Sequence, residues 1–165
     1  MAEQPIALRP PEHRVERRAI GLWALQSVIG FAILSGLILT AYLIFDSARS
    51  WLGPILVVVA VWGAVVTVVM PVWRYAVHRW EVTDDAVYAA SGWVVREWRV
   101  APISRIQTVD TTRGPLEQAL KLATLEVTTA SSRGPIKVIG IDATVAAQVA
   151  AELAKITQRT PGDAT

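Results

Sequence analysis

The sequence predicts an α+β membrane protein, in which a two-helix transmembrane hairpin is followed by a small β-barrel or a pair of orthogonal sheets capped by a C-terminal α-helix. The hairpin is predicted by two apolar runs, residues 19–45 and 51–73, which contain no charged residue and are separated by a short polar turn. The small β-domain is predicted by a change of pattern after residue 76, where short β-rich segments alternate with turn residues.

The two apolar runs have the length and composition of membrane-spanning helices. A bilayer core needs about 20 consecutive apolar residues in helical form, and both runs meet that length. The alternative, two core helices of a soluble domain, requires a polar stripe on each helix for its solvent face, and neither run has one. Near the ends of the runs lie aromatic residues of the kind that favour the headgroup layer: Trp23, Phe45, Trp51, Trp73 and Tyr75.

Two features of the runs bear on how the helices pack. Pro54 is expected in the first turn of the second helix, where its missing N–H costs nothing. Small residues that would let the helices approach closely occur in both runs: Gly30, Gly36, Gly63 and Ala64.

The arginines around the hairpin predict its orientation. Those that flank it are Arg14, Arg17 and Arg18 before the first run and Arg74 and Arg79 after the second. The connecting turn carries Arg49 alone, beside Asp46. Because Lys and Arg collect on the cytoplasmic side, we expect a multi-pass protein of the cell membrane with both termini in the cytoplasm. A cleaved signal peptide is the competing interpretation, but the first run is too long and no small-x-small site precedes a polar mature start.

The chain therefore divides into four parts. Residues 1–18 are expected to form an N-terminal cytoplasmic tail with a charged end, residues 19–75 the hairpin, residues 77–159 a compact domain, and residues 160–165 a C-terminal tail. A domain of that size is near the lower end of what folds alone.

Short strands and one amphipathic helix are expected in the compact domain. The strands are expected at residues 77–83, 87–91, 94–101, 106–112, 123–130 and 136–141. Asp142 is expected to cap the final helix, because a carboxylate at that position accepts from the amides of the next turn. The apolar face of this helix follows at spacings of four, four and three residues: Val145, Val149, Leu153 and Ile156. Gly114, between a strand and a helical turn, is expected to have a positive φ.

The order of these parts resembles the bacterial PH-domain membrane proteins of the YdbS-like type. The matching segments are Pro-Ile-Ser-Arg-Ile-Gln-Thr-Val at 102–109, the Gly-Pro-Leu turn at 114–116, Leu-Ala-Thr-Leu-Glu-Val-Thr-Thr-Ala at 122–130 and Gly-Ile-Asp-Ala at 140–143. The resemblance covers residues 12–159 and implies a pleckstrin-homology-like (PH-like) fold at a membrane. It implies no catalytic residues. Phosphoinositide-binding PH domains place basic residues on the first β-turn, whereas here that turn carries Asp84 and Asp85, which does not favour phosphoinositide binding.

Composition and motifs argue against several functions. Residues 77–159 carry ten Lys or Arg and nine Asp or Glu, so the basic surplus of a nucleic-acid binder is missing. The chain has no cysteine, which excludes disulfides and thiolate chemistry. Gly114 and Gly134 stand alone, so there is no glycine-rich phosphate loop.

Few residues are candidates for chemistry. Ser91, His78 and Asp110 could be combined into a triad, but no nucleophile elbow supports it, and His78 is expected to be an interfacial residue. His13 lies in the predicted tail. Asp84 and Asp85 are a weak metal signal, better explained as turn residues. A basic patch could include Arg96, Arg99, Arg105, Arg113, Lys121, Arg133 and Lys137, although interleaved acids favour a solvated surface.

The sequence therefore favours no enzyme and no catalytic, cofactor-binding or metal-binding residue. It is consistent with a binding or scaffold module at the cytoplasmic face of the membrane, which recognises a protein or peptide. The alternative is an accessory subunit whose hairpin packs inside a larger membrane complex. In both cases the partners are the lipid bilayer and a protein that the sequence does not identify.

Overall fold

The structure, a computed structural model, describes residues 11–92, 94–130 and 134–159, which form two compact units. One unit is the helical hairpin, residues 17–76. The other unit combines the segment before the hairpin with the residues after it. Each unit is described separately below.

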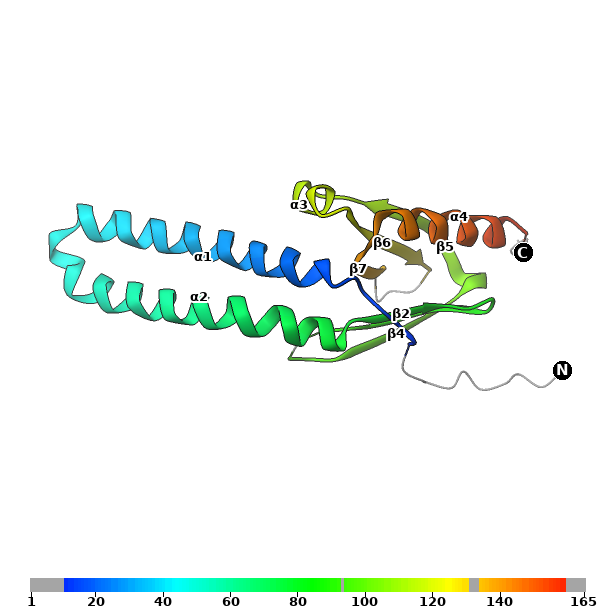
Figure 1. Ribbon diagram of the computed structural model, residues 1–165, viewed down its shortest axis with the longest axis horizontal. Coiled ribbons are helices and arrows are strands. Elements are labelled where there is room, and N and C mark those ends of the chain that lie inside the picture. The colour runs from blue at the N-terminus through cyan, green and yellow to red at the C-terminus, as the bar shows by residue number, and fades with distance from the viewer. Residues whose placement is uncertain (1–10, 93, 131–133, 160–165) are drawn as a thin grey trace. The chain divides into compact units, whose positions relative to one another are not determined.

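The hairpin consists of α1 (Arg18–Ile44) and α2 (Arg49–Val77), connected by the short 3-10 helix η1 (Asp46–Ala48). Figure 1 shows the two helices side by side. Both are long and apolar enough to cross a membrane. Most of their large apolar side chains are exposed, as expected of helix faces that lie against lipid. The prediction of two long apolar helices is confirmed.

Close approach of the two helices depends on Gly63. A Cβ at this buried position would lie 2.7 Å from Cγ of Phe31, so a side chain would push the helices apart. Gly30 and Gly36 have no such neighbour, since a Cβ at either would meet nothing within 4 Å. The packing prediction therefore holds for Gly63 and is wrong for the glycines of α1. Pro54 is also not in the first turn, because α2 begins one turn earlier, at Arg49.

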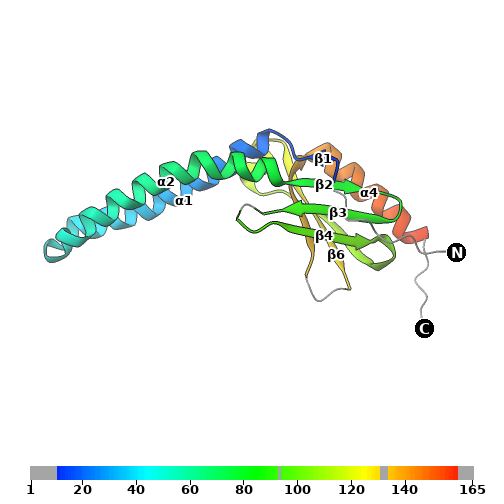
Figure 2. The ribbon, with the colours of Figure 1, turned by 90° about the horizontal axis from the view of Figure 1, so that it is seen from below.

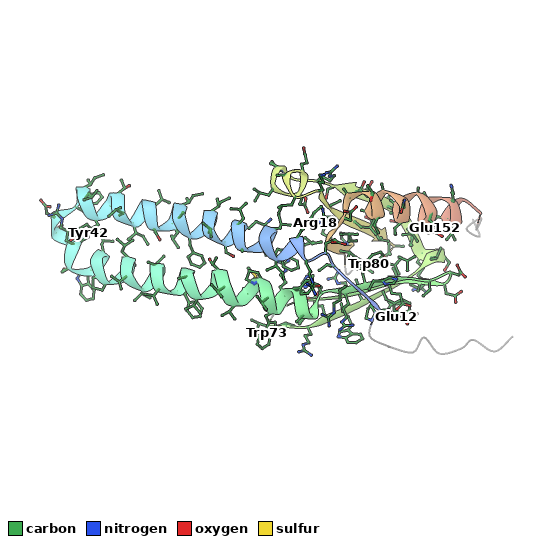
Figure 3. The ribbon with its side chains drawn as sticks, viewed as in Figure 1. Glu12, Arg18, Tyr42, Trp73, Trp80 and Glu152 are labelled. Atoms are coloured by element: carbon green, nitrogen blue, oxygen red, sulfur yellow. The ribbon has the colours of Figure 1, made fainter. Side chains whose placement is uncertain are left out.

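Arg49 organises the turn of the hairpin. Its guanidinium donates to the backbone oxygens of Tyr42 and Leu43 at 3.0 and 3.3 Å, and so satisfies carbonyls left open at the end of α1. It also pairs with Asp46 at 2.8 Å. Tyr42, whose ring lies under the same guanidinium, marks this end of the hairpin in Figure 3.

Two antiparallel sheets form the second unit. The first contains β1 (His13–Arg14), β2 (Arg79–Val82), β3 (Ala86–Ser91) and β4 (Glu97–Pro102), in that order across the sheet (Figure 2). The second contains β5 (Ile106–Thr112), β6 (Leu122–Thr129) and β7 (Ile136–Asp142), also in chain order. The connections include η2 (Ile103–Arg105) and the short helix α3 (Pro115–Ala119). This arrangement confirms the prediction of paired sheets with a C-terminal helix.

Strand β1 was not predicted. His13 pairs with Trp80 and Arg14 with Arg79, while the amide of Glu16 donates to the carbonyl of Gly140 in β7 at 2.9 Å. The short segment before the hairpin therefore bonds to both sheets. The predicted boundaries, a tail through residue 18 and a domain from residue 77, need correction: the hairpin is inserted between the first two strands of the sheet fold.

The C-terminal helix α4 (Ala143–Arg159) packs against the second sheet and η2. Ala146 and Leu153 are fully buried, and Val149 is half-buried. Oδ1 of Asp142 accepts from the amide of Thr144 at 2.9 Å, which confirms the predicted cap. The rest of the apolar core comes from both sheets, including Trp80, Val87, Ala101, Leu125, Val127 and Val138.

The positive φ angles lie elsewhere than predicted. Gly114 has a φ of −71°, so the prediction for it is wrong, and its N–H donates to Oε2 of Glu117 at 2.7 Å. Positive φ occurs at Gly92, with 117°, and at Lys121, with 55°, among others. Gly92 directly follows β3, and β4 begins three residues later than expected because Val94 to Arg96 belong to the loop.

Candidate functional site

The catalytic triad considered from sequence is not supported. His78 is buried immediately before β2, and Ser91 ends β3, so these two lie at the same end of the first sheet. Asp110 lies in β5 of the other sheet and is exposed, and its carboxylate accepts from Thr108 at 3.2 Å. His13, expected in a tail, packs its ring against Trp80 with 5.5 Å between centroids.

Asp84 and Asp85 form the turn between β2 and β3. Both are exposed, and the backbone oxygen of Asp85 accepts from the amide of Ile103 at 2.9 Å. Thr83 and Ala86 close the turn through the threonine hydroxyl. Across the part of the chain that the structure describes, no group of three or more His, Cys, Asp or Glu could hold a metal ion. Turn formation therefore accounts for the acidic pair.

The predicted basic patch is dispersed over several elements. Arg99 donates to the backbone of Pro135 at 3.0 Å, and Arg113 donates to that of Leu122 at 3.2 Å. Lys137 pairs with Glu126 at 3.1 Å. Lys121 occupies the positive-φ turn before β6, Arg105 lies in η2 and Arg96 in the β3–β4 loop, whereas Arg133 lies outside the described residues. The six of these residues that the structure describes do not form one anion site.

A different set of residues meets at one end of the first sheet. The strand registers place Arg14, Arg79, Ala90 and Trp98 side by side across β1, β2, β3 and β4. Directly paired residues in antiparallel strands point to the same face. Two arginines and a tryptophan therefore share one face of the sheet, and we refer to these four residues as the proximal row.

The β3–β4 loop extends past the proximal row and exposes apolar side chains. Val94 is 75% exposed and Val95 70%, and Trp98 at the start of β4 is 46% exposed. Arg96, between them, is also exposed. Exposed aliphatic and aromatic side chains that gather at one place on a small domain indicate an interaction surface.

Gly92 sets the shape of this loop. A Cβ at Gly92 would lie 1.8 Å from the backbone oxygen of Val95, and its φ of 117° is one that side-chain-bearing residues rarely adopt. The backbone of the loop therefore folds back onto Gly92. The sequence alone did not single out this loop, although its run of Val and Trp next to a glycine was a usable signal.

The hairpin carries a second surface feature. A groove of about 380 Å³ runs between α1 and α2, and most of the residues that line it are small or bear a hydroxyl. These include Ala32, Ser35, Ala60, Gly63, Ala64 and Thr67. Small residues let the backbone of another helix approach closely in a membrane.

Known proteins match this chain over both units. The family model of the bacterial PH domain matches residues 24–157. The UPF0699 transmembrane protein YdbS of Bacillus subtilis (strain 168) is 29% identical over 125 residues, which is 74% of this chain and 79% of the relative. No solved structure matches. The matched segment includes most of the hairpin as well as the strands β2 to β7.

Proposed function

Because the chain belongs to the bacterial PH domain family and resembles a transmembrane relative, we propose that it is a binding or scaffold module at the cytoplasmic face of the cell membrane, where it holds a protein partner. The PH domain family is not a family of enzymes, and the proposed role involves no catalytic step.

The insertion of the hairpin between β1 and β2 is the observation that carries this proposal. Three residues separate Arg14 of β1 from the start of α1, and one residue separates the end of α2 from β2. The sheet fold is thus connected to the membrane helices by two short links instead of one flexible linker. Both ends of the inserted hairpin thus join the sheet fold within a few residues, which suits a module that recruits a partner to the bilayer.

The arginines support the cytoplasmic location of both termini. Arg14, Arg17, Arg18, Arg74 and Arg79 flank the helices on the side of the two links. Arg49 in the turn is already engaged with Asp46 and with two carbonyls of α1, so a local structural role explains its place on the other side. The positive-inside rule then favours a cytoplasmic domain and an external turn.

Topology reporters test this orientation. Alkaline phosphatase is active only outside the cytoplasm, so its fusion after Thr165 should be inactive and its insertion at Ser47 should be active. A fluorescent protein at the same two sites should give the reverse pattern. Phosphatase activity at the C-terminus would exclude the proposed cytoplasmic module.

The groove of the hairpin supports a second candidate function, an accessory subunit of a larger membrane complex. Ala64→Leu places a larger side chain in the groove, and a partner helix seated there should be lost. Gly30→Leu is the matched control, since a Cβ at Gly30 meets nothing within 4 Å and the residue does not line the groove.

Purification in mild detergent distinguishes the two candidates. A stoichiometric membrane protein that copurifies with the wild type and with Gly30→Leu, but is lost in Ala64→Leu, supports the subunit. A soluble partner retained in all three proteins supports the module. If no partner is retained by any of them after crosslinking in cells, both candidates are contradicted.

A further inference from the structure

The end of the first sheet that bears the proximal row is also the end closest along the chain to the membrane helices. β2 begins at Arg79, only two residues after the last residue of α2, and β3 returns toward it, with Ala90 opposite Arg79 (Figure 2). The loop after Ser91 therefore extends beyond the first residue of β2. This follows from the strand register within one sheet.

Chain geometry limits how far this end can be from the bilayer. The second apolar run ends at Trp73, and Arg79 lies at most about 13 Å farther along the chain, given the helical rise to Val77 and two extended residues. The polar layer on each side of a bilayer core is itself several ångströms thick. The β3–β4 loop is thus held within reach of the headgroups.

The composition of this surface fits an anionic bilayer. Val94, Val95 and Trp98 supply exposed aliphatic and aromatic groups, the combination that partitions into the interfacial layer. Arg96 in the loop and the arginines of the proximal row lie beside them. Basic residues near anionic lipid are attracted to its surface potential.

We propose that Val94, Val95, Arg96 and Trp98, together with Arg14 and Arg79, form a lipid-contact surface that inserts into the headgroup layer of an anionic membrane. It provides a third attachment to the bilayer, in addition to the two covalent links, and thereby limits rotation of the sheet fold. This inference goes beyond the proposed function, because it concerns lipid and holds whether or not a protein partner exists.

Probes on the full-length protein can test this contact because the chain has no cysteine. Val95→Cys carries an environment-sensitive fluorophore in the loop. Ser104→Cys, an exposed and nearly isosteric position in η2, is the matched control, since η2 follows the opposite end of β4. Both proteins are reconstituted in vesicles of phosphatidylcholine alone or mixed with phosphatidylglycerol. Spin-labelled lipid and acrylamide serve as the lipid and aqueous quenchers.

In the anionic vesicles the Val95 probe should be quenched by the labelled lipid and protected from acrylamide, whereas the Ser104 probe should show the reverse. Adding Arg96→Gln to Val95→Cys should reduce the ratio of lipid-contacting to water-exposed probe by roughly fivefold. Equal acrylamide quenching of the two probes in anionic vesicles would overturn the proposal and leave the protein-binding function unaffected. Equal lipid quenching of the Val95 probe with and without phosphatidylglycerol would overturn anionic lipid as the occupant.

Discussion

Single residues in this protein matter most where the backbone leaves a regular element. Gly92 ends β3 with a φ of 117°, and Arg49 supplies hydrogen bonds that α1 lacks at its C-terminus. Glu117 links α3 to its surroundings, because its carboxylate accepts from the amide of Gly114 and from the hydroxyl of Thr124, both at 2.7 Å. Gly92 adopts a φ that other residues rarely adopt, whereas Arg49 and Glu117 supply hydrogen-bond partners to nearby groups.

Gly92→Ala should destabilise the sheet fold by more than about 2 kcal/mol, because an added methyl meets the Val95 carbonyl and the φ angle is strained for alanine. Gly114→Ala is the control, with an ordinary φ and a nearest contact of 3.6 Å. Its cost should be close to zero, since the lost cap preference offsets the gain in chain entropy. Thermal unfolding in detergent measures both, and equal melting temperatures would contradict the role of Gly92.

Arg49→Gln should destabilise the hairpin by about 1–2 kcal/mol, because it removes the ion pair with Asp46 and two bonds to carbonyls of α1. Ser50→Ala changes a neighbouring exposed residue and should have little effect. Denaturation of the reconstituted hairpin in increasing sodium dodecyl sulfate compares the variants. An Arg49→Gln curve that coincides with that of Ser50→Ala would show that the cap is not needed.

The strands and the long helix of the second unit are stabilised by the apolar side chains that they bury. Strands β5, β6 and β7 present Ile106, Leu125, Val127 and Val138 to the interior, and α4 adds Leu153. Strand β1 has only two residues, and both are exposed. The residue that follows it, Val15, is buried, with 4% of its surface exposed. Burial of Leu153 therefore holds α4 in place, and burial of Val15 anchors the segment that follows the exposed strand β1.

Leu153→Ala should cost about 2–5 kcal/mol, because the side chain is fully buried between α4 and the second sheet. That is a large share of the stability of so small a domain. Gln148→Ala, on the exposed side of α4, should have almost no effect. Limited proteolysis of the full chain in detergent compares the two, and equal resistance would show that α4 does not close the core.

On the scale of the whole molecule, the hairpin interrupts a sheet that would otherwise be continuous. His13 and Arg14 pair with Trp80 and Arg79 as the two arms of a β-hairpin would, although the helices lie between them in sequence. Glu12 also donates its amide to the buried carboxylate of Glu81 at 3.3 Å. The sheet fold therefore depends on a segment from before the membrane helices.

A fragment of residues 77–159 should be less stable, by roughly 2 kcal/mol or more, than one in which a short Gly-Ser linker joins residues 11–16 to residues 77–159. The linked fragment retains β1 and buried Val15, and the register places the two ends to be joined close together. Urea unfolding followed by tryptophan fluorescence compares the two fragments. Equal midpoints would show that β1 contributes nothing to the fold.

The sequence by itself determined the features that depend on near neighbours. The apolar runs predicted both long helices, because a bilayer requires length and apolarity within one segment. The strand at Ile106–Thr112 and the cap at Asp142 were also predicted, since alternation and capping act over a few residues. The resemblance to the PH-domain family rested on the order of these local elements.

Only the tertiary structure decided the features that depend on distant partners. β1 is two residues long, and the segment around it bonds to residues as distant in the sequence as Gly140, so no local pattern marks it as a strand. Gly92 and not Gly114 has the positive φ, because the pairing of β3 with β4 sets the shape of the loop. The proximal row exists only because the register of four paired strands places one residue of each strand directly opposite the next. Such juxtapositions depend on which strands pair, and β1 pairs with β2 across the whole helical hairpin, a partner that no short-range pattern identifies.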